Sequence, residues 1–260
     1  MKQSVLCLLA LIFTAVFPLC VYAETLPRVV HVVVALCDNV NQGIVPVPSK
    51  LGNGADPANN LYWGAAYGVK SFMRKQPGWV MKPAPGPVTD SSVLERVVFF
   101  NAGLGLVVVA DAYDGSAIRK ATRDFLNYAA RKSQSFITVG GKTLGVGGNS
   151  DLVVYVGHNG LMDFRLTTFP RGVSEKPQFV AIFACRSKAY FTEAIKESGA
   201  YPLVWTRGNM APEAYSLHAL LTAWAAGKKG GEIREAVAQA YNTYQKCGIK
   251  GARGLFATGW

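Results

Sequence analysis

Five apolar segments rich in valine and isoleucine, each four to eight residues long, constrain the fold of this chain most strongly. Segments of that length and composition are typical of buried strands. Between them lie stretches with the apolar period of amphipathic helices. This alternation predicts an α/β fold with a mostly parallel sheet and helices on both of its faces, which is a three-layer sandwich. The predicted strands cover residues 29–36, 104–110, 152–156, 179–183 and 202–205.

The segments between these strands predict the rest of the fold. A loop rich in Gly, Pro and Asn covers residues 39–60, and loops of this length are often functional. Residues 136–148 have a Gly-Gly turn between two β-prone pieces, which predicts a small hairpin. No linker or shift in composition divides residues 24–260, so we expect a single domain there. Helices are predicted over 61–74, 117–131, 190–198, 212–226 and 233–246.

The first 23 residues have the pattern of a secretory signal peptide. Lys2 precedes an apolar run over residues 5–19, and Val21-Tyr22-Ala23 suits signal peptidase, which would cut before Glu24. An uncleaved anchor is the alternative. Beyond this run the sequence has no unbroken stretch of about 20 apolar residues, the length needed to cross a bilayer. We therefore expect a secreted or periplasmic protein without stable membrane insertion.

Charge and cysteine content limit the classes of function that are open to this chain. The chain has 27 Lys and Arg against 16 Asp and Glu, so the basic excess persists after the signal peptide is removed. These charges are scattered and do not form a stripe with interleaved aromatic residues, which argues against a nucleic-acid partner. Cys37, Cys185 and Cys247 remain in the mature chain. Because their number is odd, at least one thiol is unpaired in an oxidising compartment, and Cys37 either pairs with Cys247 or is a buried thiol.

Two chemically active side chains follow successive predicted strands. The strand over 152–156 leads into Gly157-His158-Asn159-Gly160, and the strand over 179–183 leads into Ala184-Cys185-Arg186-Ser187. Ligands of open α/β sheets bind at the carboxyl ends of the strands. A thiol needs a base to become a good nucleophile, and imidazole is well suited to move protons near neutral pH. Either residue alone would be interpreted as structural. Together they predict an acyl-transfer site.

The segments around these two residues resemble the caspase-like cysteine peptidases, a group that includes legumains, gingipains, clostripain and separases. Phe183-Ala184-Cys185-Arg186-Ser187 shares Ala-Cys-Arg with the caspase pentapeptide Gln-Ala-Cys-Arg-Gly. The chain departs from the family pattern at Asn159, which separates His158 from Gly160, and at Ser187, which replaces a glycine. The interval of 27 residues from His158 to Cys185 is shorter than the roughly 50 residues of caspases.

The resemblance implies a caspase-like fold and a cysteine endopeptidase that acts on peptide or protein substrates through a thioester. In this scheme Cys185 attacks the carbonyl, and His158 protonates the departing amine and later activates water. The backbone amides of Cys185 and of Asn159 or Gly160 would hold the oxyanion. The scheme needs no cofactor, and the sequence has no zinc-ligand spacing.

The resemblance also suggests where a substrate binds. Peptide substrates of this family lie in extended form near the fifth strand, so Trp205, Thr206 and the following Arg207-Gly208 are candidate contacts. If the specificity is for basic residues, an acid must line the pocket. Asp38, at the end of the first strand, is the first candidate, and Asp56 is the second.

Other polar residues have structural interpretations. His31 lies within a strand pattern and His218 within a helix, so both are expected to be packing residues. Asp114 is expected to cap a helix, and Asp111 has no histidine nearby in the sequence with which to bind a metal. Two other classes of function stay open. One is a cysteine hydrolase for small amides or cell-wall peptides, and the other is a secreted binding protein that has lost activity.

Overall fold

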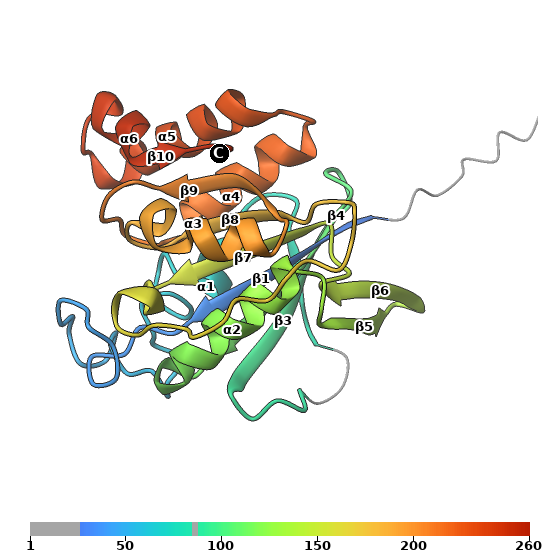
Figure 1. The fold of residues 1–260 in the computed structure, drawn as a ribbon, viewed down its shortest axis with the longest axis horizontal. Coiled ribbons are helices and arrows are strands. Elements are labelled where there is room, and N and C mark those ends of the chain that lie inside the picture. The colour runs from blue at the N-terminus through green and yellow to red at the C-terminus, as the bar shows by residue number, and fades with distance from the viewer. Residues whose placement is uncertain (1–26, 85–87) are drawn as a thin grey trace, which may run out of the picture.

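The computed structural model describes residues 27–84 and 88–260 (Figure 1). The expected signal peptide over residues 1–23 and its cleavage site before Glu24 lie outside the described residues. The main feature is an eight-stranded sheet with the order β10-β9-β8-β7-β1-β4-β3-β2. Its strands are β1 (Arg28–Ala35), β2 (Val80–Pro83), β3 (Val93–Asn101), β4 (Leu106–Tyr113), β7 (Leu152–Gly157), β8 (Phe179–Phe183), β9 (Tyr201–Thr206) and β10 (Phe256–Ala257).

The centre of this sheet is parallel. Strands β4, β1, β7, β8 and β9 pair in parallel, whereas β2, β3 and β10 add antiparallel pairs at the two edges. A separate hairpin consists of β5 (Gln134–Val139) and β6 (Lys142–Gly147). All five parallel strands end at the same edge of the sheet. This edge therefore collects the loops that follow β1, β4, β7, β8 and β9.

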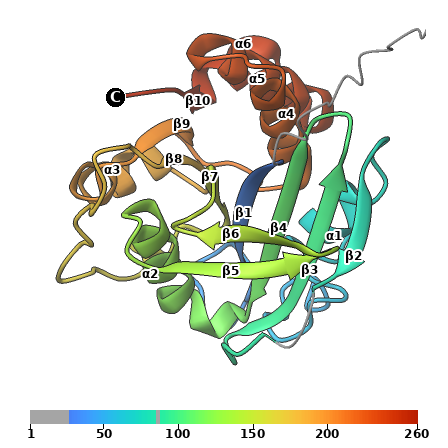
Figure 2. The same ribbon diagram turned by 90° about the vertical axis from the view of Figure 1, so that its right-hand side faces the viewer.

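Helices cover both faces of the sheet. Apolar residues of α1, α4, α5 and α6 pack on one face, and those of α2 and α3 pack on the other. The hairpin lies across the sheet on the same side as α2 (Figure 2). Along β1, Val32 contributes to the first layer and Val33 to the second, as the two-residue period of a strand requires. The helices are α1 (Val69–Met73), α2 (Ile118–Ala129), α3 (Ser187–Glu197), α4 (Ala214–Ala225), α5 (Gly230–Gln245) and α6 (Ile249–Leu255).

The predicted α/β architecture, with a mostly parallel sheet and helices on both faces, is confirmed. The five predicted strands correspond to β1, β4, β7, β8 and β9, and the predicted hairpin to β5 and β6. The sequence pattern did not predict strand β3, because the charged residues Glu95 and Arg96 interrupt its apolar run. The structure pairs both charges: Glu95 binds Lys70 and the indole N–H of Trp63, while Arg96 binds Asp111. Strands β2 and β10 and helix α6 were also not predicted.

The predicted helix over 61–74 is wrong for most of its length. Only Val69–Met73 is helical, and turns occupy the residues before it. Two glycines explain the difference. A Cβ on Gly64 would lie 2.1 Å from the carbonyl oxygen of Ala58, and one on Gly68 would lie 2.4 Å from the carbonyl carbon of Trp63. The chain is folded back on itself here more tightly than a helix allows.

A buried polar network connects β1, β3 and β4 on the face that the hairpin covers. His31 Nε2 lies 3.0 Å from Asp111 Oδ2, and Arg96 donates two hydrogen bonds to the same carboxylate. His31 Nδ1 accepts from the backbone N–H of Gly147 at 2.8 Å, which leaves Nε2 as the donor. Asp111 therefore has a histidine partner that its place in the sequence does not reveal, because strand pairing brings together residues 80 positions apart. His31 is buried, as expected.

No helix within residues 27–84 and 88–260 is both long and apolar enough to span a membrane.

Candidate active site

The two predicted catalytic residues follow the ends of two neighbouring strands, at equivalent positions in the strand register. Strands β7 and β8 are parallel, and Val156 pairs with Phe183. His158 is two residues beyond the first of these positions and Cys185 is two residues beyond the second. Since neighbouring strands are about 4.8 Å apart, this register brings the two loops side by side at the carboxyl edge of the sheet.

The backbone before His158 requires a glycine. Gly157 has a φ angle of 140°, and a Cβ at this position would lie 2.5 Å from the carbonyl oxygen of Ala35 on β1. The carbonyl of His158 accepts a hydrogen bond from the hydroxyl of Tyr155 at 2.8 Å. These contacts hold the histidine, which is buried, just beyond the end of β7.

The His158 ring has a carboxylate partner that sequence reasoning missed. Its Nε2 atom lies 2.8 Å from Oδ2 of Asp163. A short 3-10 helix, Gly160–Met162, turns the chain so that a residue only five positions later reaches the ring. A hydrogen bond to a carboxylate fixes the orientation and tautomer of an imidazole, and it leaves Nδ1 for proton transfer. The sequence contained one signal for this pair, an aspartate only five residues after the histidine.

The long loop over residues 39–60 reaches the site through Gly43. The backbone N–H of Gly43 donates to Asp163 Oδ2 at 3.0 Å, so one carboxylate oxygen accepts both this bond and that of His158. A Cβ on Gly43 would lie 2.5 Å from Asp163 Oδ1. The loop therefore helps to position Asp163, and only a glycine leaves room for the carboxylate.

Asn159 joins the two loops with its side chain. Its Nδ2 atom donates to the backbone carbonyl of Cys185 at 2.7 Å, and its Oδ1 atom accepts from the backbone N–H of Leu161 at 3.1 Å. The residue is fully buried. The sequence prediction used only its backbone amide. The structure gives the side chain a positioning role, because it connects the histidine loop with the cysteine loop.

Cys185 lies at a strained turn between β8 and α3. The next residue, Arg186, has a φ angle of 49° in the left-handed region, where residues other than glycine are uncommon. Its backbone N–H donates to Gly208 at 2.8 Å. Helix α3 begins directly after it, at Ser187. The thiol is therefore presented beside the N-terminus of a helix, a position that favours negative charge.

In this state the thiol is held by the loop after β9. Among the described residues its partners are the backbone N–H of Met210, at 3.3 Å from Sγ, and the carbonyl of Met210, at 3.4 Å. The His158 ring is held by Asp163 instead. Among the described residues, no hydrogen bond joins the thiol to the imidazole.

Three backbone amides at this edge are predicted to bind an oxyanion. Among the described residues, no acceptor is paired with the N–H groups of Asn159, Gly160 or Cys185. Close packing explains why position 160 is a glycine, because a Cβ there would lie 2.8 Å from the ring of Phe164. Donors without an internal partner, next to a nucleophile, suit the stabilisation of a developing negative charge.

Asp38 is near this edge but is engaged locally. Its Oδ1 atom accepts from the backbone N–H groups of Val40 and Asn41 at 2.9 and 3.1 Å, and its Oδ2 atom accepts from the side chain of Asn41 at 2.8 Å. The residue borders a cavity of about 490 Å³ together with Asp114. Asp56, the second candidate, accepts from the N–H of Ala58 and from the Asn59 side chain within its own turn.

Trp205 and Thr206 are not at the surface of this structure. Both are fully buried, and the Thr206 hydroxyl bonds to Ser187 and to the carbonyl of Ala184. Strand β10 pairs with β9 at these two positions and so occupies the edge that an extended peptide would use. Met210, four residues after Thr206, contacts the Cys185 thiol instead.

The three cysteines within residues 27–84 and 88–260 are free thiols, so Cys37 and Cys247 are not bonded to each other. Cys37 is fully buried and Cys247 is exposed. Burial raises the pKa of the Cys37 thiol to about 11, even though a hydrogen bond from Tyr62 opposes the shift. Burial also raises the pKa of Tyr62, and the nearby Cys37 and Cys185 add to that shift.

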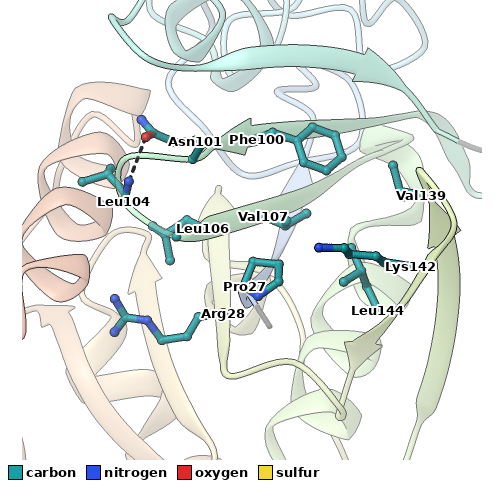
Figure 3. A pocket seen from close by; sticks show the side chains of 12 residues that line it. Pro27, Arg28, Phe100, Asn101, Leu104, Leu106, Val107, Val139, Lys142 and Leu144 are labelled. Atoms are coloured by element: carbon teal, nitrogen blue, oxygen red, sulfur yellow. Dashed lines mark hydrogen bonds between the residues drawn. The ribbon is translucent and has the colours of Figure 1, made fainter. Parts of the chain in front are cut away.

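A larger cavity lies at the opposite edge of the sheet. It has a volume of about 650 Å³ and lies between the start of β1, the β3–β4 turn and the β5–β6 hairpin. Figure 3 shows its mostly apolar lining, which includes Phe100, Leu106 and Leu144. His158 and Cys185 follow the carboxyl ends of their strands, so this cavity is not part of the candidate site.

No group of three or more His, Cys, Asp and Glu side chains in the described part of the chain is arranged to hold a metal ion. Comparisons with protein-family models, with curated proteins and with solved structures found no match.

Proposed function

We propose that this protein is a cysteine endopeptidase of the caspase-like type, with Cys185 as the nucleophile and His158 as the general acid and base. The observation that carries the proposal is the contact of 2.8 Å between His158 Nε2 and Asp163 Oδ2, just beyond the end of β7, the strand next to the one that leads to Cys185. A nucleophile, a base and a residue that orients the base form the usual constellation of acyl-transfer enzymes.

The reaction uses two half-steps. The thiolate of Cys185 attacks the substrate carbonyl, the imidazolium of His158 protonates the leaving amine, and a thioester remains. His158 then takes a proton from water, which attacks the thioester and releases the acid. The amides of Cys185 and of Asn159 or Gly160 stabilise the oxyanion in both half-steps. Asp163 is a positioning residue, because it acts through His158.

The proposed setting is a secreted or periplasmic one, as the N-terminal pattern over residues 1–23 implies. Peptide or protein substrates are the proposed partners, and the chemistry described needs no cofactor.

Digestion of a peptide library tests this function. The purified mature protein and its Cys185→Ala variant are incubated with proteome-derived peptides, and new termini are identified by mass spectrometry. We expect cleavages that the variant does not make. If both proteins leave the library intact after limited proteolysis to activate them, the peptidase proposal fails.

A hydrolase for small amides is a second candidate. It is favoured by one observation, the pairing of β10 with β9 at Trp205 and Thr206, which covers an edge where an extended peptide could add. This enzyme would keep Cys185 as its nucleophile. It would hydrolyse short amide substrates while leaving longer peptides intact. In a binding protein that has lost its activity, in contrast, Cys185 would react with iodoacetamide no faster than the exposed Cys247 does.

A further inference from the structure

The loop that holds the thiol leads directly to an acidic side chain. Met210 contacts Cys185 Sγ, and Glu213 follows three residues later. The N–H of Glu213 donates to the carbonyl of Ala211 at 2.9 Å, and the N–H of Ala211 donates to the hydroxyl of Tyr241 at 3.1 Å. Three residues of chain span at most about 10 Å. Glu213 is therefore within reach of a substrate residue close to the one attacked by Cys185.

Only one of the two oxygens of the Glu213 carboxylate accepts hydrogen bonds. Both of its hydrogen bonds end on Oε2, from the hydroxyl of Tyr215 at 2.9 Å and from Nε2 of Gln245 at 3.2 Å. Within the described residues, Oε1 has no hydrogen-bond partner and no Lys or Arg pairs with this carboxylate. Burial raises the pKa of Glu213, and the two hydrogen bonds only partly oppose that shift. A half-buried carboxylate without a cation would be stabilised by a ligand that brings one.

Tyr215, which donates to this carboxylate, belongs to a cluster of aromatic rings. Tyr215 and Tyr244 stack in parallel, with centroids 4.4 Å apart, and Tyr67 meets both edge-on at 6.1 and 5.4 Å. Tyr67 is 44% exposed and Tyr244 is 41% exposed, so solvent reaches both rings. Ring faces attract Lys and Arg side chains, most strongly where water is partly excluded. A carboxylate beside exposed tyrosines is thus chemically suited to a basic side chain.

We propose that Glu213, with Tyr67 and Tyr244, forms a subsite that binds a lysine or arginine side chain of a peptide substrate. The inference rests on the proposed peptidase function, because it names the substrate class of that site. Asp38 is a weaker candidate for this role, since both of its oxygens already accept hydrogen bonds from its own loop. Glu213 keeps one oxygen for the ligand, and it belongs to the loop that contacts the thiol.

The test separates binding from cleavage. Synthetic octapeptides carry arginine, or its neutral isostere citrulline, at each position in turn. Binding to the Cys185→Ala protein is measured by fluorescence anisotropy. We expect arginine to bind about tenfold more tightly than citrulline at one position, the effect of one favourable charge contact. In the double variant that adds Glu213→Gln this preference disappears, because the amide keeps the shape but not the charge.

Glu193→Gln is the matched control, since Glu193 is an exposed glutamate on α3. It should leave the arginine preference unchanged. The inference is overturned if arginine and citrulline bind equally at every position, or if the preference survives Glu213→Gln. If the preference is present but the wild-type protein cleaves none of the peptides, the proposed peptidase function fails while the subsite stands.

Discussion

His158 and Asp163 form a side-chain pair at the end of β7, with 2.8 Å between Nε2 and Oδ2, and the same oxygen of Asp163 also accepts the backbone N–H of Gly43. The ring is therefore fixed by its own loop and by a segment more than 100 residues earlier in the chain. Because imidazole must present a defined nitrogen to the thiol, this pair determines whether the site can transfer protons.

Asp163→Asn tests the pair directly. The amide keeps the size of the side chain but removes its charge, so the ring loses the carboxylate that fixes its orientation and tautomer. We expect kcat/KM for peptide cleavage to fall by about 100-fold, the lower end of what general acid–base catalysis contributes. The circular dichroism spectrum should not change. Unchanged activity would show that Asp163 does not orient His158.

Gly43→Ala should lower the activity, although Gly43 lies outside the two loops that carry His158 and Cys185. The new methyl group would lie 2.5 Å from Asp163 Oδ1 and push the carboxylate away from His158. We expect a fall in kcat with little change in melting temperature. Gly251→Ala is the control, because nothing lies within 4 Å of a Cβ at that helical position. Equal activities of the two variants would contradict the role assigned to the loop.

Asn159→Ala should lower the free energy of unfolding. It removes the hydrogen bond that the buried Asn159 side chain donates to the carbonyl of Cys185, and leaving that carbonyl without its partner costs about 1–3 kcal/mol. Urea denaturation measures this cost. Asn127→Ala on α2, where the side chain is half-buried, is the comparison and should cost less. A larger loss in Asn127→Ala would mean that the bridge between the two loops is not important for stability.

Stability should decrease in alkaline solution because of Cys37. Burial raises the pKa of this thiol from its ordinary 9.0 to about 11, so the folded state holds its proton when the unfolded state has lost it. The stabilisation is complete below pH 9 and is lost as the pH rises from 9 towards 11. Melting temperatures at several pH values measure the slope. Cys37→Ala should flatten it, whereas Cys247→Ala, at an exposed thiol, should not. A slope that survives Cys37→Ala would contradict this assignment.

Sequence patterns predicted the five central strands, the hairpin and four of the five expected helices well, but they missed the edge strands and misjudged residues 61–68. Runs such as 29–36 and 152–156 are mostly apolar because both faces of these strands are buried, and that signal is local. Strand β3 carries Glu95 and Arg96, whose partners come from other elements, so its pattern resembles a loop. The turns over residues 61–68 depend on close backbone packing at Gly64 and Gly68, which a helical apolar period does not reveal.

The candidate site was predictable only in part. The positions of His158 and Cys185 follow from strand ends in a parallel sheet, and the structure places them as expected. The role of Met210 could not be predicted, because it depends on how the loop after β9 folds back onto Cys185. The resemblance to the caspase-like peptidases implies that Trp205 and Thr206 contact a peptide, but the pairing of β10 with β9 buries both residues.

The most direct test of the account is to trap the thioester. A peptide ester is mixed with the mature protein, the reaction is quenched with acid, and the intact mass and the labelled fragment are determined. The account predicts an acyl group on Cys185 in the wild-type protein and much slower acylation in the His158→Ala variant. Substrate turnover without acylation of Cys185, or acylation that is equally fast without His158, would contradict it.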